Sequence, residues 1–415
     1  MHLRFSACAI SAVLVLTSCA TQTQSGQSPS PSTVTVTETA GPTGAAPADP
    51  TVFTPVVGSV LAPPMPVAAT DAKTHLAYEL VLTNAGPQEV TLTSVAAVAG
   101  DKTLLTLSGD ELANWTRRLG NPAPTTTIRP SETALVWLDV VIDEASGSPS
   151  DISHTIAMSV ANPQPPLTEA TMTETIAATT VDNRKPVTIS PPLRGENWMD
   201  GDSCCGMTAH RMAVSPLNGA LWAPERYAID YVQLSSDGRM FNGDKGNLVS
   251  YPYFGADVLA VADGPVVAVV DGLAEQVPGA NPRGLPLDQY AGNRVVQDIG
   301  GGNYVLYAHL KTGSVRVKVG DRLTTGQTLG SLGNTGNSDA PHLHFELMST
   351  PDPLRSNGLP FVFDKFRLDS RIASTDALNN LTDTGGPAER QHGVAARDQT
   401  LVMPLVLDVM TYPAR

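Results

Sequence analysis

The sequence has little positive charge, no long apolar run beyond its first residues, and few cysteines. It contains 26 Lys and Arg residues against 40 Asp and Glu residues, for a formal net charge of -14. Such a chain lacks the basic surface that binds phosphate backbones, so we expect no nucleic acid partner. After residue 20 no run of about 20 apolar residues occurs, so no membrane-spanning helix is predicted there.

Residues 1–18 have the features of a secretory signal peptide. A short basic region precedes the apolar run Ala7–Leu16, and small residues follow it. The run Leu16-Thr17-Ser18-Cys19 resembles the bacterial lipobox, whose cysteine is lipidated and becomes the mature N-terminus. We therefore predict export, with the lipid on Cys19 holding the protein at the outer face of the bacterial cell membrane, in the cell envelope. The alternative is a plain signal peptide in which Cys19 is incidental.

Two cysteines, Cys204 and Cys205, are then expected in the folded chain, because Cys8 leaves with the signal peptide and Cys19 carries the lipid. Adjacent cysteines form a strained vicinal disulfide or stay as thiols. Thiolate metal ligands are a third option, although no second cysteine pair exists to complete such a site. A local structural role is the interpretation we favour.

The rest of the chain divides by composition. Residues 19–52 are rich in Ser, Thr, Pro, Gly and Gln, which predicts a disordered tether. Residues 53–190 contain short β-type runs separated by turn residues, which predict an immunoglobulin-like antiparallel β-sandwich without catalytic residues, a spacer or protein-binding module. After a Pro-rich connector, residues 199–365 have little helical periodicity and should form a second antiparallel β domain. Residues 366–415 are predicted to form an exposed loop and a strand that returns to the sheet.

The segment Leu332–Leu347 is the most informative part of the sequence. A turn-rich glycine loop leads into a run of alternating residues, so a strand there would place His342, His344 and Glu346 on one face. Two imidazoles side by side on a strand can hold a metal ion or move a proton. The alternative is a solvated strand face that happens to carry two histidines.

Several segments together resemble the lysostaphin/LytM family of zinc metallopeptidases. They are Arg226–Asp230, Tyr307–Leu310, Val319–Gly330, the glycine loop 333–336 and His342–His344. The resemblance covers roughly residues 220–350. It implies an antiparallel β domain of the LytM type, the duplicated hybrid motif, with a groove in which peptidoglycan peptides are cleaved.

The resemblance also implies roles for individual residues. Asp230 and His344 match two zinc ligands, and His309 and His342 match the two catalytic histidines. Zinc held by three protein ligands keeps a fourth position for water and lowers the pKa of that water to roughly 7. One histidine would then act as general base and the other would stabilise the developing oxyanion.

One position departs from the family pattern. The first zinc ligand falls on Arg226, and a guanidinium has no lone pair for a metal ion. On a strand Arg226 would share a face with Asp230, so we expect it to pair with that carboxylate. His210 is the proposed replacement ligand, unless it is only a surface or hydrogen-bonded histidine. His392, or the cysteines at 204 and 205, are remoter candidates.

These residues support a lipid-tethered zinc metalloendopeptidase that hydrolyses peptide bonds of peptidoglycan, and the pair His309 and His342 favours it. Arg226 favours a catalytically degenerate module that binds peptidoglycan or regulates a cell-wall amidase. A third possibility is an envelope interaction protein that works through the β-sandwich. The expected partners are peptidoglycan peptides, a cell-wall hydrolase, and the membrane through the lipid anchor.

Overall fold

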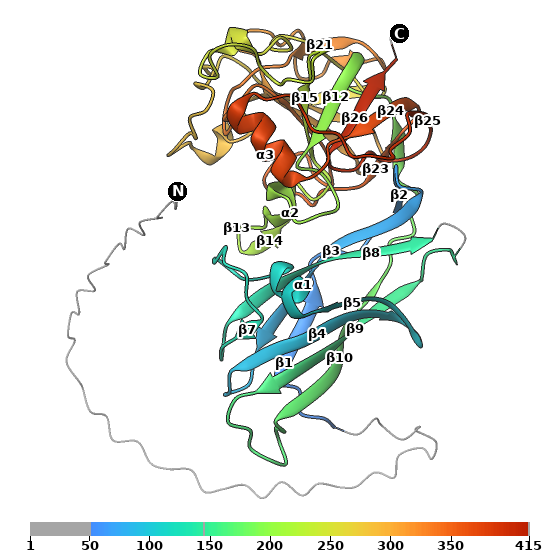
Figure 1. Ribbon diagram of the computed structural model, residues 1–415, viewed down its shortest axis with the longest axis vertical. Helices are drawn as coiled ribbons and strands as arrows, with labels where there is room; N and C mark the ends of the chain where they lie inside the picture. The colour runs from blue at the N-terminus through green and yellow to red at the C-terminus, as the bar shows by residue number, and fades with distance from the viewer. Residues whose placement is uncertain (1–50, 144–145, 414–415) are drawn as a thin grey trace, which may run out of the picture. The chain divides into compact units, whose positions relative to one another are not determined.

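The computed structural model describes residues 51–143 and 146–413. The predicted signal peptide, the lipidation at Cys19 and nearly all of the predicted tether lie outside the described residues. From Phe53 onward the described chain forms one compact unit, in which strands predominate (Figure 1). The expected mainly β fold is confirmed, since every pair of strands among the described residues is antiparallel except β11 (Val187–Ile189) with β23 (Phe361–Phe363). None of the described helices is long and apolar enough to cross a membrane.

The N-terminal part contains two five-stranded antiparallel sheets. One has the order β1-β3-β8-β6 with β2 beside β3, and the other has the order β10-β9-β4-β5 with β7 beside β4. Both contribute side chains to one hydrophobic core, as a β-sandwich requires. The immunoglobulin-like character of this part and its boundaries at 53 and 190 stay predictions. The elements are β1 (Val56–Val60), β2 (Val67–Ala68), β3 (Lys73–Asn84), β4 (Val90–Ala99), β5 (Lys102–Ser108), α1 (Gly109–Asn114), β6 (Thr116–Arg118), β7 (Thr127–Ile128), β8 (Thr133–Asp143), β9 (Asp151–Val160) and β10 (Thr171–Thr180).

Strand β3 is buried on both faces. Tyr78 and Leu80 point into the core between the two sheets. Side chains alternate along a strand, so Ala77 and Glu79 point the other way. There Ala77 packs in a small cluster with Tyr227, Cys204 and Cys205, residues that lie more than a hundred positions further along the chain.

A ten-stranded antiparallel sheet organises the second half of the chain, in the order β20-β17-β18-β19-β22-β15-β12-β26-β24-β25. Two two-stranded sheets, β13 with β14 and β16 with β21, lie outside it. The strands are β12 (Gly195–Gly201), β13 (Ser215–Leu217), β14 (Ala220–Trp222), β15 (Ile229–Gln233), β16 (Asp257–Leu259), β17 (Gly264–Val270), β18 (Asn293–Asp298), β19 (Tyr304–Leu310), β20 (Arg322–Leu323), β21 (Thr328–Ser331), β22 (Leu343–Met348), β24 (Phe366–Arg371), β25 (Arg397–Gln399) and β26 (Asp408–Tyr412). The short helices are α2 (Ala209–Met212) and the 3₁₀ turns Leu248–Ser250 and Leu287–Gln289.

Strand β22 lies near the middle of this sheet and every one of its residues is buried. Leu343, Phe345 and Leu347 belong to the main hydrophobic core. His344 and Glu346 alternate with them and therefore face the opposite side of the sheet. The predicted alternation thus places polar groups on one face of a buried strand, where they are shielded from bulk water.

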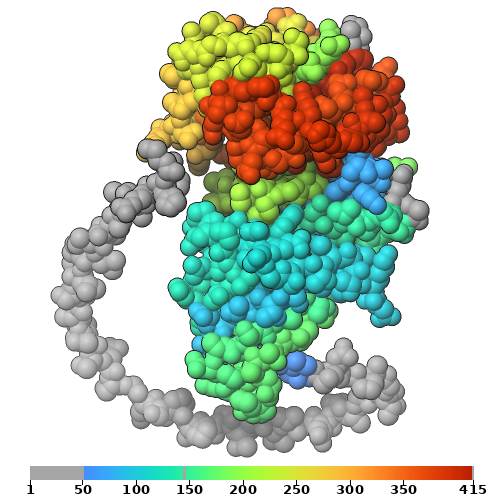
Figure 2. Space-filling model, viewed as in Figure 1, coloured from blue at the N-terminus to red at the C-terminus, as the bar shows by residue number. Residues whose placement is uncertain are grey.

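The C-terminal segment differs from the prediction of an exposed loop. Residues Thr375–Thr384 form helix α3, which Figures 1 and 2 show in red. Ser374 caps the first turn of this helix, and Gly385 ends it with φ +64. Leu381 is on the buried face of the helix. Ser and Gly at these two ends are ordinary helix signals that the loop-like composition around them concealed. The returning strand is β26, which begins at Asp408, after Pro404, a residue with no N–H to offer a neighbouring strand.

Candidate active site

Two central strands bring Asp230 and His344 together. In the pairing of β15 with β22, Asp230 stands directly opposite His344. The Nδ1 atom of His344 lies 3.0 Å from Oδ1 of Asp230. Its Nε2 atom lies 3.9 Å from Oε2 of Glu346, the next polar residue on the same strand face. The strand ladder, a rigid element, therefore sets the carboxylate and the imidazole in contact.

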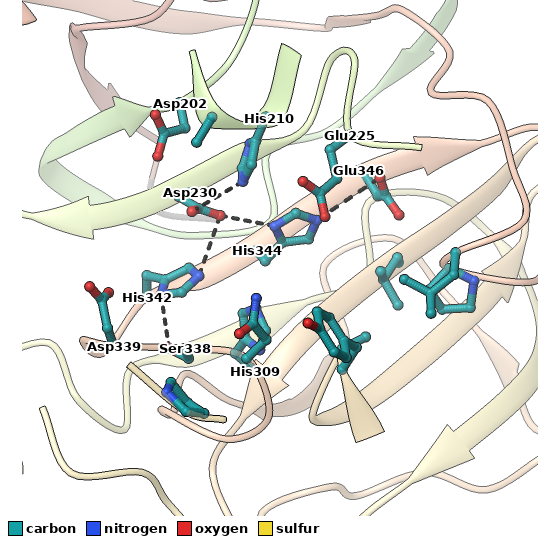
Figure 3. Close-up of a pocket in the computed structure, with 18 of the residues that line it drawn as sticks. Asp202, His210, Glu225, Asp230, His309, Ser338, Asp339, His342, His344 and Glu346 are labelled. Atoms are coloured by element: carbon teal, nitrogen blue, oxygen red, sulfur yellow. Dashed lines mark hydrogen bonds and ion pairs between the residues drawn. The ribbon is translucent and has the colours of Figure 1, made fainter. Parts of the chain in front are cut away.

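The short helix α2 adds His210 to this pair. Its Nε2 atom lies 3.3 Å from Oδ2 of Asp230, and its Nδ1 atom donates a hydrogen bond of 3.1 Å to the carbonyl of Ala228. One nitrogen or oxygen from each of His210, Asp230 and His344 lies within 4.8 Å of the others (Figure 3). The described residues thus include a group of two imidazoles and one carboxylate that could hold a metal ion.

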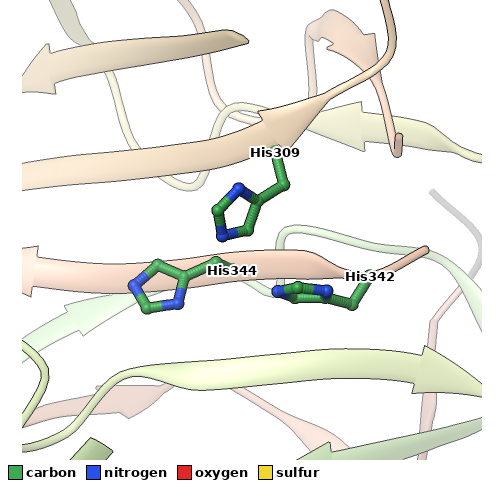
Figure 4. A group of neighbouring side chains, drawn as sticks. All are labelled: His309, His342 and His344. Atoms are coloured by element: carbon green, nitrogen blue, oxygen red, sulfur yellow. The ribbon is translucent and has the colours of Figure 1, made fainter. Parts of the chain in front are cut away.

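His309 and His342 lie beside this group. The ring centroids of His309 and His342 are 4.7 Å apart, and those of His309 and His344 are 5.7 Å apart. Figure 4 shows the three rings turned toward one another, with His309 on a strand next to the one that carries His344. The Nε2 atom of His342 is 3.4 Å from Asp230. All five predicted site residues that carry an imidazole or a carboxylate therefore line one pocket, with a volume of about 260 Å³.

Backbone carbonyls orient both flanking histidines. His309 donates from Nδ1 to the carbonyl of Thr335 at 2.7 Å, and His342 donates from Nδ1 to the carbonyl of Ala340 at 2.8 Å. A carbonyl oxygen can only accept, so in each neutral ring the lone pair is on Nε2. His309 also has φ +57, an uncommon backbone conformation for a residue other than glycine. The chain maintains this conformation at the end of β19, where the ring enters the pocket.

The glycine loop is what brings Thr335 close enough to accept from His309. A Cβ atom on Gly333 would lie 2.3 Å from the backbone nitrogen of Lys311, just beyond β19. A Cβ atom on Gly336, where φ is +78, would lie 2.3 Å from the backbone nitrogen of Gly292. Only glycine permits these approaches, so the loop sequence is a requirement of the site's geometry.

Charge in the pocket centres on Asp230. Burial raises the pKa of this carboxyl, but the neighbouring His210 and His342 outweigh burial and hold the pKa well below its usual value. Burial lowers the pKa of His210, and the charge of Asp230 more than compensates, raising that pKa to about 9. Burial, together with the nearby His342 and His344, keeps the pKa of His309 well below its usual value. His309 is therefore neutral at neutral pH and able to accept a proton.

Arg226 does not pair with Asp230, contrary to expectation. It lies in the turn before β15, where Ala228 donates its N–H to the carbonyl of Glu225, so strand alternation does not apply to it. Its Nε atom donates to Glu79 of β3 at 3.0 Å, and its Nη2 atom contacts the same carboxylate. The side chain that occupies the family's first ligand position therefore points away from the pocket.

The other candidate replacement ligands are elsewhere. Cys204 and Cys205 form a disulfide with each other, one of the three states considered for them. Cys205 lies beside His75 and Asp139, a different group from the one at Asp230. His392 is exposed, between α3 and β25.

Sequence reasoning missed some of the acidic and polar residues that line the pocket. Asp202 and Glu225 lie in its wall, and Ser338 contacts Nδ1 of His342 at 3.2 Å. Ser338 lies four residues before His342 in a loop. A serine at this spacing from a histidine is too common in sequences to indicate a contact. Nothing in the local sequence of Asp202 or Glu225 indicates that they approach the histidines.

The antiparallel β-sheet thus carries on one face a buried group of histidines and one aspartate that could hold a metal ion. Residues 244–356 match Peptidase family M23, and this range includes His309, His342 and His344 but not Asp230 or His210. The match to Peptidase family M23 confirms the resemblance to lysostaphin and LytM seen in the sequence.

Two curated relatives match the same part of the chain. Peptidoglycan DD-endopeptidase ShyA of Vibrio cholerae is 34% identical over 105 residues, which cover 25% of this chain and 22% of that protein. Glycyl-glycine endopeptidase ALE-1 of Staphylococcus capitis is 36% identical over 98 residues, which cover 23% of this chain and 25% of that protein. The chain thus spans a quarter or less of the length of these relatives. The solved catalytic domain of lysostaphin from Staphylococcus simulans is 24% identical with a TM-score of 0.20, over 38% of this chain and 80% of that one.

Proposed function

We propose that this protein is an envelope-tethered zinc metalloendopeptidase that hydrolyses peptide bonds of peptidoglycan. The observation that carries the proposal is His210, whose Nε2 atom lies 3.3 Å from Asp230 and supplies the third ligand that Arg226 does not. The names of the matched relatives, a peptidoglycan DD-endopeptidase and a glycyl-glycine endopeptidase, support this class of substrate. The lipobox-like sequence ending at Cys19 supports a location in the envelope, where that substrate is found.

His210, Asp230 and His344 would hold the zinc ion. Two imidazoles and one carboxylate are a known catalytic zinc set, which leaves a coordination position open. The hydrogen bond from Nδ1 of His210 to Ala228 leaves Nε2, the atom that faces Asp230, to bind the metal once the proton held there is released. Glu346 lies on the Nε2 side of His344 and favours a proton there, so that Nδ1 is free to bind metal. When bound, zinc would polarise the scissile carbonyl and lower the pKa of a bound water.

His309 and His342 would perform the proton transfer and charge stabilisation. His309 offers the lone pair of Nε2, which its lowered pKa keeps free of a proton, and its place beside the proposed zinc ligands suits it to the role of general base. His342 is oriented by Ala340 and can donate to an oxygen that becomes negative during attack once its Nε2 is protonated. Because both rings are buried, water competes poorly for these hydrogen bonds.

The alternative function is a degenerate M23 module that binds peptidoglycan or regulates a cell-wall amidase. Arg226 at the usual ligand position is the observation in its favour. It predicts a folded protein without zinc, whose groove still holds a wall peptide.

Metal content and cleavage distinguish the two functions. The purified full-length protein is dialysed, its zinc is measured by elemental analysis, and purified sacculi are incubated with it. The proposal expects about one zinc per chain, in line with a single set of three protein ligands, and released peptides. No zinc after incubation with excess metal, together with intact sacculi, would reject the enzyme in favour of the binding module.

A further inference from the structure

We propose that Glu79, in the N-terminal β part of the chain, is a positioning residue for the metal site formed by His210, Asp230 and His344. It would act by holding Arg211 and Arg226, two arginines adjacent to the segments that carry His210 and Asp230. The inference rests on the proposed zinc site. It adds that strand β3 of the N-terminal sheets helps to position the ligands of that site.

Glu79 is completely buried and both of its carboxylate oxygens are used. Nη1 of Arg211 donates to Oε1 at 2.8 Å, and Nε of Arg226 donates to Oε1 at 3.0 Å and to Oε2 at 3.1 Å. The side chains of Glu79 and Arg211 are 0% exposed, and that of Arg226 is 4% exposed. Ion pairs without solvent are little screened, and losing one member leaves a buried charge unpaired, so this contact is held strongly.

Other contacts fix the two guanidinium groups as well. Nη2 of Arg211 donates to the carbonyl of Leu138 on β8, the neighbour of β3, at 3.2 Å. Nη1 of Arg226 donates to the carbonyl of Gly358 at 3.3 Å. A Cβ atom on Gly358 would lie 3.0 Å from the backbone nitrogen of Arg226, so the chain packs tightly at this point. Each arginine is therefore held by Glu79 and by a backbone carbonyl.

Arg211 is the residue directly after His210 in helix α2. Consecutive helical side chains differ in direction by about 100°, so one reaches β3 while the other reaches Asp230. Helix α2 has only four residues and cannot hold its own orientation through internal hydrogen bonds. The ion pair from Arg211 to Glu79 therefore acts with the Thr208 cap and the hydrogen bond from His210 to Ala228 to fix where His210 points.

Arg226 helps to orient His210 through the turn that precedes β15. Two residues after it, the carbonyl of Ala228 accepts the hydrogen bond that orients His210, and two residues further on comes Asp230. Holding Arg226 against Glu79 fixes the turn that presents this carbonyl. The arginine at the family's first ligand position thus supports the replacement ligand instead of competing for the carboxylate of Asp230.

The expected consequence is a loss of metal affinity that exceeds any loss of folding. Replacing residues that orient metal ligands typically weakens metal binding by about 10–100-fold. Glu79→Gln removes the charge with little change of shape, and we expect a weakening in that range. Glu79→Asp keeps the charge but shortens the reach, so it should restore part of the affinity.

The test uses the full-length protein and the zinc ion alone. The zinc dissociation constant is measured by competition with a chromogenic chelator, and thermal unfolding of the metal-free forms shows whether each variant is folded. Glu174→Gln is the matched control, because Glu174 is another buried carboxylate of the sandwich, in β10. A role limited to stability would lower the unfolding temperature and leave the dissociation constant of the folded protein unchanged.

Weaker zinc binding in Glu79→Gln, with near wild-type binding in Glu174→Gln, is the expected result. Equal affinity in Glu79→Gln and the wild-type chain would overturn the inference while leaving the proposed zinc site intact. If Glu79→Gln does not fold, the zinc dissociation constant of Arg211→Lys is measured in its place. This variant keeps the positive charge and loses the forked contact of Arg211 with Glu79 and Leu138. Unchanged affinity in a folded Arg211→Lys overturns the inference. No zinc binding by the wild-type chain would overturn the proposed function and this inference together.

Discussion

The imidazole of His210 lies with Nε2 3.3 Å from Oδ2 of Asp230, while Nδ1 of the same ring donates to the carbonyl of Ala228. The two contacts fix both the position and the tautomer of a histidine that comes from a four-residue helix instead of a strand of the sheet. The proposed zinc site therefore takes one ligand from a segment outside the range that matches Peptidase family M23.

Removing His210 should remove the metal. With His210→Ala only Asp230 and His344 remain in the ligand group, and two protein ligands hold zinc poorly. We expect zinc content close to zero after dialysis, and cleavage of sacculi reduced by at least about 100-fold, since metal activation of water supplies several kcal/mol. His392→Ala, an exposed histidine, is the control and should keep both. Full zinc content in His210→Ala would mean that another residue is the third ligand.

Removing His309 should separate catalysis from metal binding. His309 faces the pocket and lies outside the proposed zinc ligands His210, Asp230 and His344, although with His342 and His344 it forms a second group that could hold a metal ion. His309→Ala is expected to keep its zinc and to lose cleavage by roughly 10²–10⁴-fold, the usual contribution of a general base. Both quantities are measured on the same preparation, against the wild-type chain. Unimpaired release of peptides from sacculi by this variant would exclude His309 as the base.

The stability of the protein should fall at alkaline pH because of His75. Burial lowers the pKa of this imidazole, but hydrogen bonds to Asp139 and Asp71 outweigh burial and raise the pKa from 6.5 to about 9. The folded protein therefore holds this proton more tightly than the unfolded chain. The resulting stability is fully present below pH 6.5 and is lost as the pH rises through about 9.

The size of the effect follows from the shift. At 1.36 kcal/mol per pKa unit, the free energy of unfolding should decrease by up to about 3 kcal/mol across this range. Denaturant unfolding at several pH values measures it. His75→Gln should flatten the decrease, whereas His392→Gln should not. An equally steep decrease in His75→Gln would assign it to other groups.

Helix α3 should depend on the glycine that ends it. Gly385 has φ +64, and a Cβ atom there would lie 2.7 Å from the ring of Phe241. Gly385→Ala should therefore lower the free energy of unfolding by about 1–3 kcal/mol, from backbone strain and the clash. Gly246→Ala, at an exposed glycine without positive φ, is the control and should change stability little. Thermal unfolding of the two variants compares them, and equal unfolding temperatures would contradict this reading of α3.

Much of the site can be predicted from local sequence because one strand carries much of it. A period of two along His342–Leu347 is enough to place His344 and Glu346 on one face, and the structure puts both in the pocket. The same rule failed for Arg226, because residues before β15 form a turn and strand alternation does not extend into it. Helix α3 was missed for a related reason, since its end signals lie within a composition typical of loops.

The amino-acid sequence by itself determined the mainly β fold, the histidines and aspartate of the pocket, and the glycines that the loop at 333–336 requires. These follow from alternation, turn chemistry and side-chain chemistry, which act over a few residues. Only the tertiary structure decided that Arg226 turns to Glu79, 147 positions away, and that His210 reaches Asp230. Such contacts form where separate sheets and helices pack against each other, and no periodicity within one segment specifies them.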